Sequence, residues 1–353
     1  MKRIYINGRF LTQNITGVQR CAVEFVKVID KYLDDENFRS KYSFQILAPK
    51  NINQKLELKN IEIKKVGYLK GHLWEQLELP FYTKNNFLFN FCNVAPVIKR
   101  NQTVIIHDAA IYAVPYAYSI YYRLWYKFIY SILSKNLKII FTVSNFSKKE
   151  INKYLNIPLE KIKVIYNGIE HINKIKIDEN IFDKFNIEKN KYVLGVSSIH
   201  PAKNFKLILK AAKKLPDFNF IIAGGNNSTV FKNRGLEIPD NVRFIGYVSD
   251  EELVALYKYA YCFIFPSVYE GFGFPPLEAM AFNCPVIVSD IEVLHEVIKN
   301  HALYCDVNNE DILIEQIKKV DDLKALREAN NREYVLTKFK WSLIVNKILN
   351  SIL

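Results

Sequence analysis

Two carboxylates, Glu270 and Glu278, flank a glycine turn in the segment 265–281. The apolar run before them is typical of a parallel strand covered on both faces. Glycine lacks a Cβ, so a ligand can approach the backbone of this turn closely. The prolines that follow predict a helix, and a helix N-terminus favours anionic groups. The segment therefore predicts a site for a ligand with hydroxyl groups and phosphates, such as a sugar nucleotide. The alternative is a plain strand–turn–helix connection in which Glu278, expected in the first helical turn, only complements the helix dipole.

Other residues of the second half also follow predicted strands. Lys203 is placed to neutralise a phosphate, and Asn204 fits the N-cap of the next helix. Gly224 and Gly225 end another strand and would again allow a ligand close to the backbone. A solvated surface lysine and an ordinary turn are the alternatives for these two positions.

The first half holds a second group of candidates. Gly17 and Arg20 lie where a helix opens after the first strand and the loop 7–16, a candidate wall of an interdomain cleft. His107 and Asp108 end a buried strand, where an imidazole oriented by a carboxylate could act as a base. A structural, hydrogen-bonding histidine is the alternative. Ser144 is predicted to cap a helix.

Short β-branched runs alternate with helical patterns along the whole chain, which predicts parallel sheets built from βαβ units. We expect two doubly wound α/β domains, residues 1–170 and 171–335, with a last helix in 336–353 that packs back on the first domain. The helices expected with the clearest pattern cover 205–215, 251–259 and 311–319. The predicted strands are 3–6, 44–47, 61–66, 87–91, 104–107, 139–143, 192–196, 218–223, 242–245, 262–265, 286–289 and 303–305.

Composition narrows the class of protein. The 353 residues are 50% hydrophobic, which excludes a disordered chain, and no apolar run is long enough to cross a bilayer. The start of the chain enters a strand directly and has no signal-peptide pattern. The five cysteines form no CxxC motif and mostly lie in apolar runs. They are expected to be reduced core residues, which favours the cytoplasm.

Positive charge is concentrated in one half of the chain. Residues 1–150 hold 23 Lys and Arg against 11 Asp and Glu, whereas residues 151–353 hold 26 against 25. The stretch 115–138 also interleaves tyrosines and Trp125 with Arg123, Lys127, Lys135 and Lys138. This pattern fits an anionic membrane surface. Stacking on nucleobases and a helix whose aromatic face lies in the core are the alternatives.

The segment 265–281 closely resembles the Glu-x7-Glu signature of the retaining, family-4 glycosyltransferases of the GT-B fold. Shorter matches occur in the same order as in that family, and together they span nearly the whole chain. They are Gly17–Arg20, Trp74–Gln76, His107-Asp108, Val143-Ser144, Asn167–Ile169, Pro201–Asn204, Phe244–Val248, Ser289-Asp290 with Glu296, and Phe339–Trp341. The variant looks most like bacterial mannosyl- and rhamnosyltransferases of O-antigen or capsule assembly.

The resemblance implies roles for several residues. Glu278 would hold the donor ribose, Glu270 and the amides of Gly271, Phe272, Gly273 and Phe274 would hold the transferred sugar, and His107 would lie beside it. Lys203 would meet the pyrophosphate. Many relatives carry an arginine six residues before this lysine or directly before it, where this chain has Ser197 and Ala202. Arg20 or Arg234 is the candidate replacement, with Gly17 also at the donor.

The implied activity is transfer of a hexose, mannose favoured and rhamnose or glucose possible, from a nucleotide sugar to a lipid-linked surface glycan. GDP-mannose is the favoured donor, and no metal or other cofactor is expected. The enzyme would be cytoplasmic and peripheral on the inner face of the membrane. The alternatives are a GT-B enzyme with a soluble acceptor, such as a sucrose or trehalose synthase or an epimerase, and, more remotely, a nucleic-acid-binding protein. No nucleic-acid partner is expected.

Overall fold

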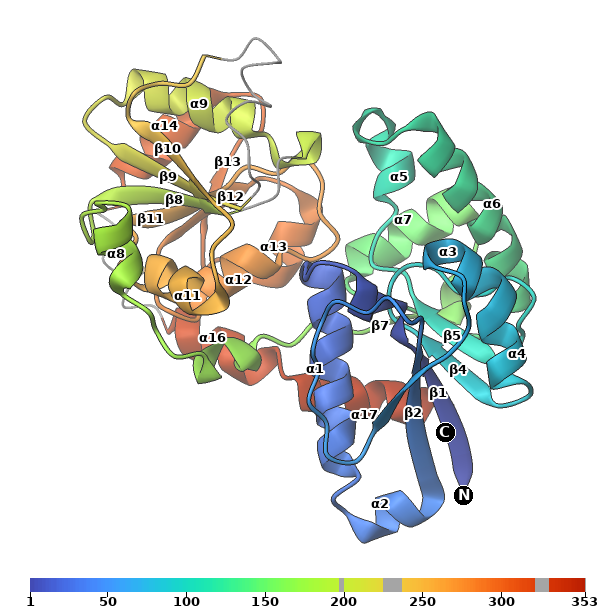
Figure 1. Cartoon of the computed structure of the whole chain (residues 1–353). Helices are drawn as coiled ribbons and strands as arrows, with labels where there is room; N and C mark the ends of the chain where they lie inside the picture. The colour runs from blue at the N-terminus through green and yellow to red at the C-terminus, as the bar shows by residue number, and fades with distance from the viewer. Residues whose placement is uncertain (197–199, 225–236, 321–329, 353) are drawn as a thin grey trace. The chain divides into compact units, whose positions relative to one another are not determined.

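The computed structural model describes residues 1–196, 200–224, 237–320 and 330–352. The chain divides into two compact units, and each is described by itself (Figure 1). The first comprises Met1–Gly168 with Trp341–Leu353, and the second comprises Ile169–Lys340. The second unit therefore begins at Ile169, and the chain returns to the first unit at Trp341.

The first unit is built on a seven-stranded parallel sheet with the strand order β3-β2-β1-β4-β5-β6-β7. Buried β-branched and aromatic side chains fill its central strands, as expected for a sheet covered on both faces. The strands are β1 (Lys2–Asn7), β2 (Tyr42–Ala48), β3 (Glu62–Lys65), β4 (Phe87–Asn90), β5 (Gln102–Ile105), β6 (Ile140–Thr142) and β7 (Ile162–Val164).

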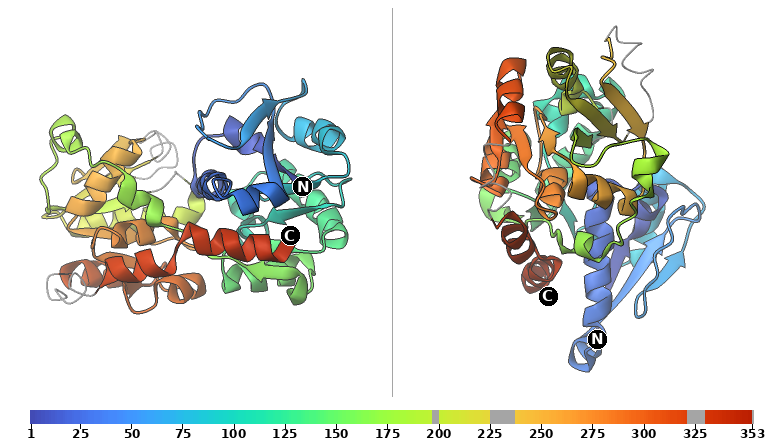
Figure 2. Two further views of the ribbon diagram at one scale, coloured as in Figure 1. Left: turned by 90° about the horizontal axis from the view of Figure 1, so that it is seen from below. Right: turned by 90° about the vertical axis from the view of Figure 1, so that its left-hand side faces the viewer.

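Helices cover both faces of this sheet. Phe89 of β4 stacks on Phe25 of α1, while its neighbour Leu88 packs on the other face against Trp74. The C-terminal helix α17 lies against α1, where Tyr32 Oη donates to the Ser342 carbonyl (3.4 Å; Figure 2). The helices are α1 (Gly17–Tyr32), α2 (Glu36–Lys41), α3 (Gly71–Leu73), α4 (Leu79–Thr83), α5 (Ala110–Ala113), α6 (Ile120–Asn136), α7 (Asn145–Leu155) and α17 (Trp341–Ile352). Short turns η1 (Gly8–Thr12), η2 (Trp74–Glu78), η3 (Pro115–Ala117) and η4 (Leu159–Lys161) join them.

The second unit has a six-stranded parallel sheet with the order β10-β9-β8-β11-β12-β13. Helices α9 and α14 pack together on one face and share a core with β8, β9, β11 and β12. The strands are β8 (Tyr192–Val196), β9 (Asn219–Ala223), β10 (Val242–Gly246), β11 (Cys262–Phe265), β12 (Val286–Ser289) and β13 (Leu303–Cys305). The helices and turns are η5 (Glu170–Lys174), α8 (Asn180–Lys184), η6 (Pro201–Lys203), α9 (Phe205–Lys214), α11 (Asp250–Tyr259), α12 (Phe274–Met280), α13 (Glu292–Ile298), α14 (Glu310–Lys318) and α16 (Asn331–Lys338).

The sequence pattern predicted two doubly wound parallel-sheet units, and both are present. All twelve predicted strands occur, with ends displaced by at most two residues. The pattern missed β7, because a three-residue edge strand with a lysine at its centre gives almost no periodic signal. The two sheets share one topological property that matters for function. Along each sheet the strand order reverses once, between β1 and β4 in the first unit and between β8 and β11 in the second. Open α/β sheets bind ligands at the carboxyl ends of the strands at such a switch point.

Candidate active site

Lys203 and Glu270 meet at the switch point of the second unit. Lys203 lies in η6, which follows β8, and Glu270 follows the adjacent strand β11. The two loops are tied together by a hydrogen bond from the Val268 N–H to the Ala202 carbonyl (2.8 Å). Lys203 Nζ lies 2.5 Å from Glu270 Oε1, and their side chains are 23% and 12% exposed. The sequence predicted that both residues serve one site but did not predict that they bind each other.

This ion pair has a defined environment and a chemical consequence. The Lys203 ammonium also lies over the Phe265 ring, 5.3 Å from its centroid, which restricts its position. An anionic ligand that approached Lys203 would compete with the Glu270 carboxylate. A ligand with a phosphate for Lys203 and a hydroxyl group for Glu270 satisfies both residues once they separate.

The turn after Glu270 depends on Gly273. This residue has φ +97°, and a Cβ at this position would lie 2.8 Å from Leu294 Cδ2. A residue with a side chain would be strained here and would also clash. The ring of Phe272 is buried and packs edge-on against Phe274 and Phe339. The turn is therefore held by the core beneath it.

Glu278 is positioned by a residue that the sequence reasoning did not identify. Helix α12 begins at Phe274, so Glu278 lies in its second turn, and its predicted place in the first turn is wrong. Its Oε2 accepts a hydrogen bond from Tyr257 Oη (3.1 Å). Tyr257 is fully buried in α11, and burial together with the Glu278 charge raises the pKa of its phenol well above the usual value. The phenol therefore keeps its proton and donates it toward the carboxylate. In the sequence, Tyr257 resembles any apolar residue on the inner face of the helix.

Other predicted residues of the second unit have mainly structural contacts. Asn204 stands at the N-cap position of α9 with φ 53°, but its side chain makes no capping hydrogen bond. Its Nδ2 instead donates to the Val307 carbonyl (2.8 Å), which corrects the predicted cap. Gly224 has φ 93°, and its N–H donates to the Gly246 carbonyl (2.7 Å). Arg234 and Ser197 lie outside the described residues.

In the first unit, His107 and Asp108 do not form the predicted carboxylate–imidazole pair. The His107 Nε2–H group donates to the Phe91 carbonyl (2.9 Å), while Asp108 Oδ1 accepts from the Ala110 N–H (2.8 Å) at the start of α5. Burial lowers the pKa of His107 to about 4, partly offset by the Phe91 hydrogen bond. The ring is therefore neutral near pH 7. β5 ends at Ile105, so both residues lie in the loop after the strand, where each is bound to a different backbone group.

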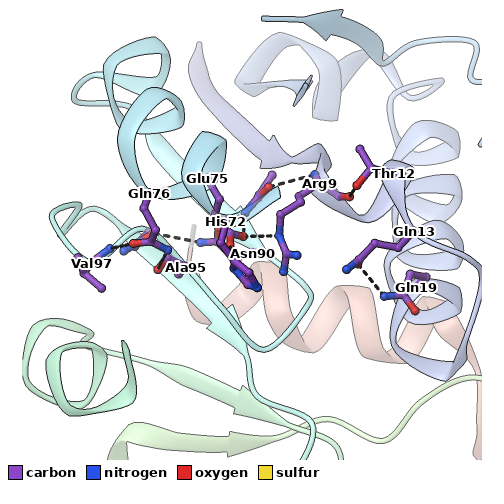
Figure 3. Close-up of polar contacts among 12 residues, drawn as sticks. Arg9, Thr12, Gln13, Gln19, His72, Glu75, Gln76, Asn90, Ala95 and Val97 are labelled. Atoms are coloured by element: carbon purple, nitrogen blue, oxygen red, sulfur yellow. Dashed lines mark hydrogen bonds and ion pairs between the residues drawn. The ribbon is translucent and has the colours of Figure 1, made fainter. Parts of the chain in front are cut away.

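The remaining candidates of the first unit lie at the start of α1. Gly17 is its first residue, and Thr16 and Gln19 form a capping box there. Gln19 also donates to Gln13 Oε1 (2.9 Å; Figure 3). Arg20 follows on the half-buried side of the same turn. Ser144 caps α7 by accepting from the Ser147 N–H (2.9 Å), as predicted.

No group of three or more His, Cys, Asp or Glu side chains among the described residues could hold a metal ion. Within the same ranges, no helix combines the length and the apolar character that a membrane span requires.

Comparison with known proteins identifies relatives over nearly the whole length. Residues 177–333 match the family model described as "Glycosyl transferases group 1". The chain is 30% identical over 343 residues to the O-antigen chain mannosyltransferase RfbU of Salmonella typhimurium, covering 92% of this chain and 93% of that protein. It is also 30% identical over 234 residues to O-antigen chain mannosyltransferase B of Escherichia coli, with 61% and 60% covered.

Solved structures support the fold. The sucrose-phosphate synthase of Thermosynechococcus elongatus superposes with a TM-score of 0.74 at 15% identity, covering 99% of this chain and 98% of that one. Anabaena HepE, solved with UDP and glucose, gives a TM-score of 0.74 at 16% identity, with 100% and 99% covered. At such identities these similarities concern the architecture, which is that of the GT-B enzymes. From the sequence relatives, the chain belongs to the group 1 family of glycosyltransferases and is a hexosyltransferase.

Proposed function

We propose that this enzyme transfers a hexose, most favourably mannose from GDP-mannose, to a growing O-antigen-type surface glycan carried on a lipid. The observation that carries this proposal is the 30% identity to an O-antigen chain mannosyltransferase over 92% of the chain. Transfer with retention at the anomeric carbon is part of the proposal. It is supported by the spacing of Glu270 and Glu278, which matches the signature of the retaining enzymes.

The switch point of the second unit would bind the donor. Lys203 would leave Glu270 to neutralise the diphosphate, which becomes the leaving group, so that no metal is needed for this step. Glu270 would then accept hydrogen bonds from hydroxyl groups of the transferred sugar. Glu278, oriented by the buried phenol of Tyr257, would accept hydrogen bonds from the ribose hydroxyls. In the first unit, considered by itself, neutral His107 would offer its Nδ1 lone pair to a hydroxyl group of a sugar, since its Nε2–H is bound to Phe91.

A surface of the first unit supports membrane association of this enzyme. Among the described residues, every exposed large hydrophobic side chain except Tyr247 belongs to the first unit. Several of them lie on the neighbouring segments α3–α4 and α6, which meet where the rings of His72 and Trp125 lie 5.7 Å apart (Figure 1). We call these residues, together with the basic side chains of the same region, the apolar–basic surface: Leu73, Leu77, Phe81, Tyr121, Leu124, Phe128, Arg123, Lys127, Lys135 and Lys138.

Helix α6 fits two of the interpretations that its sequence allowed, a core helix and a membrane-facing helix. Tyr126 and Tyr130 are buried in the core, as in the simplest interpretation. Tyr121 and Phe128 are 83% and 55% exposed, and they lie among cations on the outer side. Aromatic rings at headgroup depth beside lysines suit an anionic bilayer. Peripheral attachment to the inner face of the cytoplasmic membrane is therefore part of the proposal.

A two-step experiment tests the proposed donor and stereochemistry. Thermal shifts are measured with GDP-mannose, UDP-glucose and dTDP-rhamnose, because a ligand that binds the folded state raises its apparent stability. The donor that gives the largest shift is then incubated with a glycolipid extract in EDTA, and the anomeric configuration of the product is determined by NMR. We expect GDP-mannose to stabilise the protein and an α-mannoside to form. No shift with any nucleotide sugar, or a β-mannoside formed from GDP-mannose, would contradict the proposal.

A further inference from the structure

The switch point of the first unit also holds a polar cluster, which is buried more deeply than that of the second unit. Asn7 ends β1 and Asn90 ends the neighbouring strand β4, and Asn7 Nδ2 donates to Asn90 Oδ1 (2.9 Å). The same Nδ2 lies 2.7 Å from Glu75 Oε1. Arg9 Nε lies 3.0 Å from that carboxylate oxygen, and the Arg9 and Glu75 side chains are 6% and 1% exposed (Figure 3). The cluster therefore brings a buried ion pair to the position where such sheets bind ligands.

The local backbone is built to hold Glu75 in this position. Residues Trp74–Glu78 form a π-helical turn, a rare conformation that is frequent at functional sites. Trp74 anchors it by donating from Nε1 to the Val66 carbonyl (2.9 Å). Gln76 anchors it again, because its amide bonds both the Ala95 carbonyl (3.1 Å) and the Val97 N–H (3.0 Å; Figure 3). Glu75, between these two anchors, points to Arg9.

The Arg9 guanidinium is left with unused donors. Its Nε lies close to Glu75, but the N–H group does not point at the oxygen well enough for a hydrogen bond. Among the described residues, the guanidinium has no other hydrogen-bond or ion-pair partner. A guanidinium has five N–H donors, and a buried donor without an acceptor is costly. A buried ion pair is also weak evidence for stability, since apolar residues of the same volume serve a core as well or better. Both observations favour a ligand-binding role.

His72 connects this ion pair to an aromatic cluster. Its Nδ1 lies 3.1 Å from Glu75 Oε2, and its side chain is 32% exposed. The imidazole lies edge-on to the rings of Trp125 and Tyr126, with centroids 5.7 and 6.1 Å away. Trp125 Nε1 is a second buried donor with no hydrogen-bond partner among the described residues. Charged donors and acceptors beside aromatic faces are the groups that recognise a sugar ring.

We propose that Arg9, Glu75 and His72 form a binding site for hydroxyl groups of the acceptor sugar, and that they determine which sugar the enzyme extends. This inference rests on the proposed function, which requires a second, glycan ligand besides the donor. A hydroxyl group can accept from Arg9 and donate to Glu75 at once. A phosphate fits less well, because the Glu75 carboxylate already compensates the charge of Arg9. Trp125 also belongs to α6, so the site adjoins the apolar–basic surface on which the lipid of the acceptor would rest.

Saturation-transfer NMR with simple glycosides tests this site directly. The probes are the methyl α-glycosides of mannose, rhamnose, galactose and glucose, and binding of GDP and UDP is measured in parallel by calorimetry. His72→Asn keeps the buried Arg9–Glu75 pair, and Arg9→Lys keeps the charge but loses the planar fork. His301→Asn is the matched control, since His301 is a ring-stacked, side-chain-bonded histidine of the second unit. We expect at least one glycoside to bind and to lose about tenfold in affinity in both variants. Nucleotide binding should stay unchanged in all three.

Three results would overturn the inference. One is a wild-type protein that binds a nucleotide but none of the four glycosides. Another is unchanged glycoside affinity in His72→Asn, the variant that keeps the ion pair and the fold. The third is displacement of the glycoside by inorganic phosphate at equal ionic strength, which would make the cluster an anion site. If the wild type binds neither GDP nor UDP, the proposed donor is wrong, and the glycoside result still decides the inference separately.

Discussion

The two units place opposite charges at the same topological position, but they bury them to different extents. In the second unit the Lys203–Glu270 pair is 23% and 12% exposed, and in the first unit the Arg9–Glu75 pair is 6% and 1% exposed. In both units the cation lies in a loop just after the first central strand. Glu270 follows the neighbouring strand, whereas Glu75 comes from the crossover that precedes it. One topology therefore supports a partly exposed ion pair in one unit and an almost fully buried ion pair in the other.

The chemistry of the two cations fits this difference. A lysine ammonium on a flexible chain can leave its carboxylate for a phosphate. The arginine fork is planar, and Arg9 lies against a carboxylate that Asn7, His72 and the π-helical turn also hold. Burial raises the pKa of Glu75, but Arg9, His72 and Asn7 outweigh this effect and lower it overall. Glu75 is therefore ionised at neutral pH, and the pair keeps both charges.

The largest expected effect is on the free energy of unfolding when the cation is removed from each ion pair. Arg9→Met leaves the buried Glu75 charge alone and should lower the free energy of unfolding by about 3–5 kcal/mol. Lys203→Met should lower it by about 1 kcal/mol, because water reaches Glu270. All three tryptophans, Trp74, Trp125 and Trp341, lie in the first unit, so their fluorescence in urea follows that unit alone. Hydrogen exchange of backbone amides in the second unit measures the unfolding of that unit. Equal losses in the two variants would show that the pairs are not energetically different.

His107 should make the stability of the first unit depend on pH. Burial lowers the folded-state pKa of His107 to about 4, below the usual histidine value of 6.5. The unfolded state then binds more protons between these two values, so the contribution is complete above pH 6.5 and is lost as the pH falls toward 4. The loss should amount to roughly 3 kcal/mol. Urea unfolding of wild type and His107→Gln, followed by tryptophan fluorescence from pH 7.5 to 4.5, measures it as the difference in slope. Parallel curves would mean that the pKa of His107 is the same in the folded and unfolded states.

Glu270→Gln sharpens the functional side of the comparison. If Glu270 binds the transferred sugar, turnover should fall about 100-fold, as for other groups that act at the reacting centre. The affinity for free nucleoside diphosphate should stay equal or rise, because Lys203 no longer has a competing carboxylate. The matched control is Glu315→Gln, which removes an α14 carboxylate from an exposed ion pair with Lys319, the residue after the helix. A parallel loss of diphosphate binding and turnover would assign Glu270 to the nucleotide instead.

The same contrast explains how much the sequence could predict. The two sheets followed from alternating strand and helix patterns, and Lys203, Glu270 and Glu278 followed from their places after strands and glycine turns. Each of these signals lies within a short stretch of consecutive residues, so it can be recognised in a single sequence. The pairing of Lys203 with Glu270 joins loops 67 residues apart, and no local pattern encodes it.

The buried residues were harder to predict. Arg9 stands in what looked like an ordinary loop, and Glu75 drew attention only as part of a family motif. Both residues can be recognised as part of a site only from the folded structure, because a π-helical turn and strand neighbours such as Asn90 bring them together. Tyr257 was missed for the same reason, since a buried phenol has the same helical periodicity as a buried phenylalanine. His107 and Asp108 were adjacent in sequence but are bound to different backbone groups.

Tyr257→Phe tests whether a positioning residue matters at the more exposed switch point. The substitution removes the hydroxyl group that donates to Glu278 but keeps the ring that packs edge-on against Phe263. Nucleoside diphosphate should bind about tenfold more weakly, because the carboxylate loses an oriented, charge-assisted hydrogen bond. Calorimetry with GDP measures recognition of the ribose, and calorimetry with mannose 1-phosphate measures recognition of the transferred sugar. Only the affinity for GDP should change. Unchanged GDP affinity with a normal melting temperature would leave Tyr257 as core alone.

The smallest expected effect concerns the surfaces of the two units. Exposed hydrophobic residues lie among cations on the first unit, and the second unit exposes Tyr247 alone among its described large hydrophobic side chains. A lysine at an anionic bilayer contributes about 1 kcal/mol, so Lys127→Gln should weaken binding to phosphatidylglycerol vesicles about fivefold. Lys318→Gln, an exposed lysine on α14 of the second unit, should change nothing. Flotation at rising salt should narrow the difference between Lys127→Gln and wild type, because screening shortens the reach of the membrane field. Equal flotation of both variants at low salt would remove α6 from the membrane contact, and the exposed stripe on α3–α4 would then have to bind the bilayer without its help.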